Sequence, residues 1–139
     1  YVGGGEECHC GSVGCLETEV TQAPLARLLA ELDVAAAGTP PPCPSSAERD
    51  VLHRQTRSLA IALANAINMV NPRLIVLGGF LRVFPAYAAV VLREELARRS
   101  MGAPRALVRV VPATLGADTL MLGAAELAFA PVLADPGRY

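Results

Sequence analysis

Residues 71–79 read NPRLIVLGG and carry the clearest fold signal of the chain. Their centre, 74–77, is a wholly apolar run between an Asn-Pro pair, which ends a helix, and a Gly-Gly turn. Short apolar runs with such boundaries are typical of an interior strand of a parallel sheet, which is buried on both faces. We therefore expect a parallel sheet with the strand 74–77 inside it.

Helical patterns flank this strand on both sides. Upstream, apolar residues recur every three or four positions from Leu52 to Val70, after a capping box formed by Ser45 and Glu48. Further expected elements are a helix over 20–32 restarting near Pro24, a surface connection at 35–46, a helix over 85–99, a strand over 107–111 and a final helix over 118–129. Alternation of helix and strand predicts an α/β architecture.

Composition restricts the class of protein. The chain has 139 residues, of which 53% are hydrophobic, and its net charge is −1, so it should fold as one globular domain. The longest apolar stretch, 58–70, is shorter than the roughly 20 residues of a membrane span, and the arginines are too scattered to bind DNA unaided. The chain starts at Tyr1 without a signal peptide, so we interpret it as a piece of a longer protein.

A cysteine loop precedes the first helix. Cys8, Cys10 and Cys15 fall within eight positions, and thiolates this close are natural ligands of tetrahedral zinc. A Cys8–Cys10 disulfide would be strained, and nothing else indicates an oxidising compartment, so we expect a cytoplasmic protein. A closed zinc site needs four ligands. We interpret His9 as a solvated loop residue and Cys43 as an incidental surface thiol, so the fourth ligand is expected before Tyr1.

The segment from Cys8 to Glu17 resembles the signature of the ROK family (repressor, open reading frame, kinase), C-x-C-G-x-x-G-C-x-E, at every defined position. The likeness extends to the Asn-Pro and Gly-Gly pattern of residues 71–79, and to Leu-Gly followed by Gly-Ala-Ala in residues 115–125. The resemblance implies that the fourth zinc ligand is a histidine of an upstream E-x-G-H segment, which this sequence does not contain.

The resemblance also implies an actin-like (ribonuclease H-like) fold, in which a sugar binds between two α/β lobes. Residues 1–139 would be most of the C-terminal lobe, a partial domain with a zinc loop at 1–17 and a linker-like connection at 35–46. The family's first lobe, phosphate-binding turn, sugar-binding Asn-Asp pair with the catalytic Asp, and regulator helix-turn-helix would all lie outside it. We therefore expect no catalytic residue in this segment and no kinase activity from it alone.

Two positions are candidate binding residues. From physical chemistry alone, Glu17 is a solvated acid that complements a helix dipole, whereas the resemblance implies that it hydrogen-bonds a sugar hydroxyl. Gly78 and Gly79 end a strand where α/β proteins bind ligands, although a tight turn explains them equally well. This turn resembles the one that contacts adenosine in kinase members of the family. Here Phe80 follows, which we expect to crowd a nucleotide, and the pattern resembles the regulator branch more.

Three hypotheses follow. The leading one is the effector-binding portion of a ROK-type transcriptional regulator, with structural zinc, a sugar ligand, and DNA contacted only through an N-terminal domain outside this segment. The alternative is the C-terminal lobe of a hexose kinase that uses ATP and magnesium. A free-standing zinc-finger nucleic-acid module is disfavoured by the charge. The resemblance implies a homodimer or tetramer, and no membrane association is expected.

Overall fold

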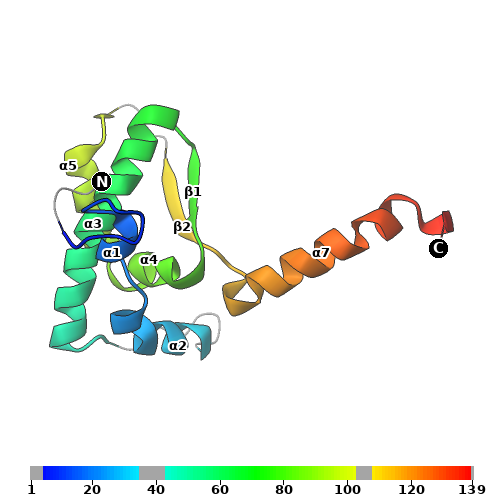
Figure 1. The fold of residues 1–139 in the computed structure, drawn as a ribbon, viewed down its shortest axis with the longest axis horizontal. Helices are drawn as coiled ribbons and strands as arrows, with labels where there is room; N and C mark the ends of the chain where they lie inside the picture. Colours follow the sequence, from blue (N-terminus) through cyan, green and yellow to red (C-terminus); the bar gives the residue numbers. More distant parts are fainter. Residues whose placement is uncertain (1–4, 35–42, 103–107, 139) are drawn as a thin grey trace.

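The structure, a computed structural model, describes residues 5–34, 43–102 and 108–138. Its longest element is the helix α3 (Ser46–Val70), which runs along one side of the compact part (Figure 1). The predicted capping box is confirmed, because the Ser45 hydroxyl accepts from the Glu48 amide while the Glu48 carboxylate accepts from the Ser45 amide. The helix ends at Asn71, whose left-handed conformation (φ 49°) closes the last turn.

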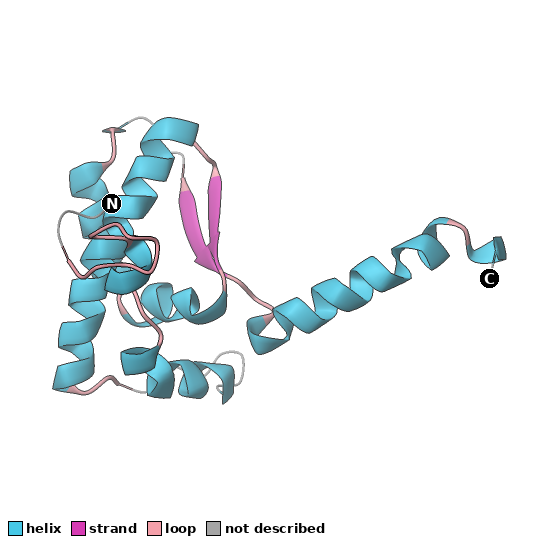
Figure 2. Ribbon diagram, viewed as in Figure 1, coloured by secondary structure: helices cyan, strands magenta, loops and turns pink. Residues whose placement is uncertain are grey.

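The sheet consists, within the described residues, of two parallel strands, β1 (Leu74–Leu77) and β2 (Arg109–Pro112) (Figure 2). Leu74 pairs with Arg109 and Leu77 with Pro112. The strand predicted at 74–77 and its parallel pairing are confirmed. Its burial on both faces is not, because Leu74 and Val76 are half exposed on the face that no described residue covers. Residue 107 of the second predicted strand lies outside the described residues.

The connection between the strands is broken into two helices, α4 (Val83–Tyr87) and α5 (Ala89–Arg99), where the sequence predicted one over 85–99. Ala88 leaves helical geometry at φ −129°, ψ 27°, and its amide still bonds to the Phe84 carbonyl. This break lets α4 bury Val83 and Phe84 while α5 follows a separate course along α3.

The segment before α3 closes one end of the core. After the short helices α1 (Leu16–Glu19) and η1 (Ala23–Leu25), the helix α2 (Ala26–Val34) begins, and it restarts at Pro24 as predicted. Leu25 and Leu28 are fully buried against α3 and α4. The core comprises thirteen buried side chains: Val20, Leu25, Leu28, Leu52, Leu59, Ala60, Ala64, Ile67, Leu77, Val83, Phe84, Leu92 and Leu96. Most of the predicted connection at 35–46 lies outside the described residues.

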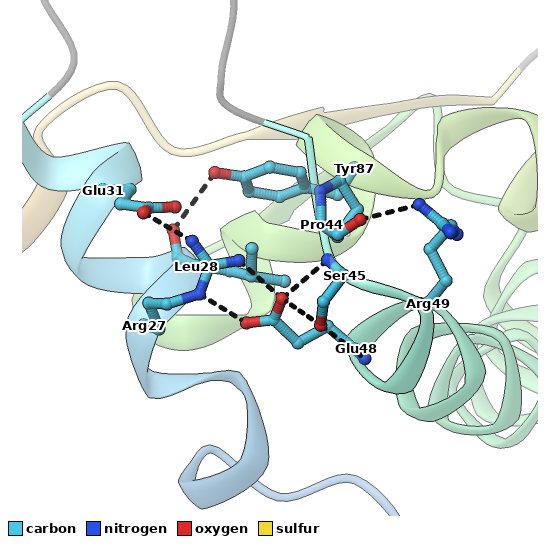
Figure 3. A network of polar contacts seen from close by, with 8 residues as sticks. All are labelled: Arg27, Leu28, Glu31, Pro44, Ser45, Glu48, Arg49 and Tyr87. Atoms are coloured by element: carbon cyan, nitrogen blue, oxygen red, sulfur yellow. Dashed lines mark hydrogen bonds and ion pairs between the residues drawn. The ribbon is translucent and has the colours of Figure 1, made fainter.

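A polar network joins α2, α3 and α4 (Figure 3). Arg27 donates to both oxygens of Glu48, at 2.7 and 2.5 Å, and to Glu31 on its own helix at 2.5 Å. The Tyr87 hydroxyl donates to the Leu28 carbonyl at 3.3 Å. The bonds from Arg27 and then Ser45 lower the pKa of Glu48 from 4.5 to about 2. The capping carboxylate of α3 therefore also fixes the position of α2.

The last helix, α7 (Thr119–Ala134), extends away from the compact part (Figure 1). It starts after the short helix η3 (Gly116–Asp118) and is followed by η4 (Pro136–Arg138). It runs past the predicted end at 129 because Pro131 is accommodated within it. Asp118 takes the predicted N-cap position without a side-chain cap hydrogen bond. None of the described helices combines the length and apolar character needed to cross a bilayer.

Candidate metal centre

The cysteine loop is shaped by two glycines and a few backbone bonds. Gly11 and Gly14 have φ values of 80° and 75°, a region that side chains disfavour. The Cys8 amide donates to the Ser12 carbonyl at 2.8 Å, and the Gly14 amide donates to the Glu6 carbonyl at 3.3 Å. These bonds form a small antiparallel bridge between Glu7 and Val13, which returns the chain toward its first cysteine.

The three predicted ligands are brought together by this turn. The sulfur atoms of Cys8, Cys10 and Cys15 all lie within 4.8 Å of one another. The sulfur atoms of Cys10 and Cys15 are separated by 3.5 Å, well beyond the length of a disulfide bond, and all three cysteines are free thiols. Three convergent soft donors fit a thiolate-binding metal. The cluster could therefore hold a metal ion.

The thiols of this cluster perturb one another. The pKa of Cys10 is lowered to about 7, chiefly by a backbone hydrogen bond from Ser12 and then by the thiol of Cys15. The pKa of Cys15 is raised to about 11, chiefly by its hydrogen bond with Cys10. Without a cation, deprotonation of Cys10 makes Cys15 harder to deprotonate. A bound metal would favour all three thiolates together.

His9 and Cys43 do not complete the ligand set. The His9 ring is largely exposed, as predicted, and its Nδ1 lies 3.6 Å from the Cys8 sulfur and 3.8 Å from a Glu17 oxygen. It forms a second grouping with Cys8 and Glu17 but does not join the three thiols in one set. Cys43 is exposed and belongs to no such cluster in the part of the chain that the structure describes. A fourth ligand from the described residues is therefore not evident.

Glu17 lies beside the cysteine cluster on a short helix. Cys15 is the N-cap residue of α1, and its carbonyl accepts a 2.9 Å bond from the Thr18 hydroxyl. Leu16 is partly buried against the core, which fixes the start of the helix. The Glu17 side chain is 71% exposed and faces His9. A ligand approaching from solvent could reach it without any rearrangement of the fold.

Sequence reasoning missed a polar hollow of about 360 Å³ that is lined in part by this helix. Glu19, Arg54 and Gln55 contribute to its lining. Gln55 is only 3% exposed, and its amide nitrogen donates to the Thr21 hydroxyl at 3.3 Å, while its carbonyl oxygen has no partner among the described residues. Gln55 lies on the apolar face of α3, and a glutamine at such a position could have indicated a buried polar site from the sequence.

The Gly-Gly turn lies at the carboxyl end of β1. Gly78 is extended and Gly79 has φ 54°, which requires glycine or a similarly tolerant residue. A methyl group at either position would meet nothing within 4 Å, so the outer side of the turn is open. Phe80 is partly buried against the core. The expectation that its ring crowds a nucleotide over the turn stays a prediction.

Arg82, which the sequence reading did not select, links the two turns that follow the strands. Its guanidinium donates to Asp33 of α2 at 2.5 Å and to the Gly79 carbonyl at 3.0 Å. It also lies 3.4 Å from where a methyl group on Gly116 would stand. Arg82 is buried, whereas Asp33 is 31% exposed. The ion pair of Arg82 and Asp33 therefore lies beside both glycine turns.

Comparison with known families decides the affiliation. The model of the ROK family matches residues 3–130, nearly the whole chain. The chain belongs to the ROK family. The match includes the cysteine loop, both strands and the Gly-Gly turn. The resemblance inferred from the loop is thus confirmed.

One solved structure of this ROK fold is described as a ROK family transcriptional regulator, a homologue of the E. coli MLC protein. It is 23% identical, with a TM-score of 0.57, over 78% of this chain. The chain spans 31% of the length of that regulator. A search of curated proteins gave no match.

Proposed function

We propose that this chain is the effector-binding portion of a ROK-family transcriptional regulator, in which a sugar binds beside a structural zinc site. The observation that carries the proposal is the convergence of Cys8, Cys10 and Cys15 directly before Glu17. Similarity to a regulator of the same family supports that branch. The proposal includes an actin-like lobe whose partner lobe lies in the rest of the protein.

Zinc suits the three thiols because a closed thiolate-rich site contributes to folding and keeps no open position for a substrate. Its role would be to fix the loop and, through it, the first turn of α1. Only Leu16 separates the ligand Cys15 from Glu17. The metal would therefore orient the carboxylate, which can accept hydrogen bonds from two sugar hydroxyls.

Sugar binding would act on DNA through the rest of the protein. A helix-turn-helix domain before the first lobe would contact the operator, and the sugar would favour one arrangement of that domain. A ligand shifts such an equilibrium only by its difference in affinity for the two arrangements. The regulator is proposed to be a cytoplasmic homo-oligomer.

The kinase alternative is supported by the open turn at Gly78 and Gly79, which lies where α/β proteins bind nucleotides. In that case ATP and magnesium would bind on this side of the cleft, and the catalytic base would come from the other lobe. Robust ATP-dependent phosphorylation of a hexose by the full-length protein would establish it and remove the regulator proposal.

The decisive experiment measures zinc content and sugar affinity of the full-length protein across hexoses and N-acetylhexosamines. Glu17→Gln should retain zinc and weaken binding of the preferred sugar at least about tenfold, because it loses a charged acceptor worth roughly 1.5–3 kcal/mol. The matched control is Glu7→Gln, an exposed carboxylate of the same loop, which should change neither property. Unaltered sugar affinity in Glu17→Gln would contradict the assigned role.

A further inference from the structure

The polar hollow of about 360 Å³ is a second candidate binding site, and Glu17 is not among the described residues that line it. Its volume lies at the lower end of the range of small-ligand pockets, about 300–1,000 Å³. Three segments of the chain meet around it: the cysteine loop, residues 18–24, and the helix α3. The hollow therefore has the size of a site for a small polar molecule.

The carboxylate of Glu19 is held in place beside this hollow by the cysteine loop. A methyl group added to Gly5 would lie only 2.0 Å from a Glu19 oxygen, so the carboxylate rests directly against the Gly5 backbone. Gly5 also has φ 126°, a conformation that favours glycine. The Glu19 side chain has no hydrogen-bond or ion-pair partner among the described residues. Its oxygens are therefore free to accept from a ligand.

Gln55 contributes a buried polar group to the same lining. Its residue is 3% exposed, and its amide nitrogen donates to the Thr21 hydroxyl, while its carbonyl oxygen has no partner among the described residues. A buried acceptor without a donor is costly, and such groups are normally paired with protein, water or a ligand. The terminal torsion of a carboxamide is broad, so the side chain can turn its oxygen toward a donor that enters the hollow.

One cation lines the hollow together with these acceptors. Arg54 precedes Gln55 on α3, and its guanidinium has no ion-pair or hydrogen-bond partner within the described part of the chain. Glu6 adds a second carboxylate to the lining. The acceptors of Glu6, Glu19 and Gln55 match the three N–H donors of a protonated amine, and the guanidinium matches a carboxylate. A small molecule that carries both charged groups satisfies the whole set.

We propose that this hollow binds a small α-amino acid as a second ligand of the protein. The ammonium group lies among the acceptors of Glu6, Glu19 and Gln55, and the carboxylate binds Arg54. Because Gly5 and Glu6 belong to the cysteine loop, the bound amino acid links that loop to α3. The proposal requires neither the sugar nor the metal of the proposed function.

Isothermal titration calorimetry of the full-length protein tests this with glycine, L-alanine and L-serine. Each is compared with its N-acetyl derivative, which lacks the ammonium group, and with its methyl ester, which lacks the carboxylate. At least one amino acid should bind saturably with a Kd of about 1 mM or tighter. Both of its derivatives should bind at least about tenfold more weakly, because each loses a charge-assisted hydrogen bond.

Two variants locate the binding. Glu19→Gln keeps the shape of the side chain and should weaken amino-acid binding at least about tenfold. Gln55→Leu removes the buried amide and should also weaken it. The matched control is Glu7→Gln, which alters an exposed carboxylate of the same loop that is not among the described lining residues, and it should leave the affinity unchanged.

The proposal is overturned if none of the three amino acids binds saturably, which would leave water as the occupant of the hollow. It is overturned equally if the N-acetyl derivative binds as well as the free amino acid, or if Glu19→Gln and Gln55→Leu both bind it normally. Weakening by Glu17→Gln in place of Glu19→Gln would move the ligand to the proposed sugar site and also overturn it. Amino-acid binding without binding of any sugar would leave this proposal standing and count against the proposed function.

Discussion

Removing the proposed zinc ion should disorder the cysteine loop while leaving the helical core folded. Ordering residues 5–14 costs about 10–20 kcal/mol of backbone conformational entropy. Three backbone hydrogen bonds lie within this stretch, from the amides of Cys8, Gly11 and Gly14, and they return only about 3 kcal/mol net. Cys8 is the only buried apolar side chain of the loop among the described residues. The loop's own contacts therefore do not offset the entropic cost of ordering it.

A structural zinc site contributes roughly 10–16 kcal/mol to the folding of its ligand loop. This contribution is comparable with the free energy that the loop's own contacts do not supply, so we expect the ordered loop to depend on the metal. Cys10→Ala removes one thiol of the cluster. It should abolish stoichiometric zinc binding, accelerate amide exchange of residues 6–15, and weaken sugar binding by releasing Glu17.

The assay combines metal analysis with hydrogen exchange of the full-length protein. Cys43→Ala is the control, since Cys43 is exposed and outside the cluster, and it should keep zinc and the exchange pattern of the loop. The reasoning is refuted if Cys10→Ala lacks zinc yet protects residues 6–15 as well as the unaltered protein. It is refuted equally if that variant loses zinc and binds sugar normally.

Two further predictions concern the polar contacts of the core. Asp33→Asn leaves the buried Arg82 without its carboxylate partner. Because Asp33 is 31% exposed and water can take its place, we expect the free energy of unfolding to fall by about 1–2 kcal/mol rather than by the full cost of breaking a buried pair. Urea unfolding should show this loss, and the exposed control Asp50→Asn should show none. Glu48 has its pKa lowered from 4.5 to about 2, so its stabilising contribution is complete above pH 4.5 and is lost as the pH falls toward 2. Glu48→Gln should flatten the acid side of a thermal melting profile, and an unchanged profile would contradict the network in Figure 3.

The sequence predicted the elements whose signals are local. The capping box at Ser45 and the helix end at Asn71 depend on a few neighbouring residues, and both are confirmed. The strand 74–77 was recognised from its apolar run and its turn. The break at Ala88 was not predicted, because it reflects the burial of Phe84 in one direction and of α5 in another.

The cysteine cluster was predictable for the same reason, since its three thiols lie within eight positions, and their convergence is confirmed. The contact between Arg82 and Asp33 was not, because the two residues are 49 positions apart and meet only in the tertiary fold. The hollow beside Gln55 likewise combines the cysteine loop, α1 and α3. Long-range polar contacts have no periodic signal in one sequence.

Arg82 bears on whether a nucleotide can bind at the Gly78–Gly79 turn, because it contacts that turn directly. Phe80, which was expected to crowd a nucleotide, is partly buried against the core. Arg82 lies beside both this turn and Gly116, and it donates a hydrogen bond to the Gly79 carbonyl. Because its charge is offset by Asp33, it offers no unpaired cation to a phosphate. A nucleotide phosphate that approached the Gly79 carbonyl would compete with the Arg82 hydrogen bond, which supports the regulator over the kinase.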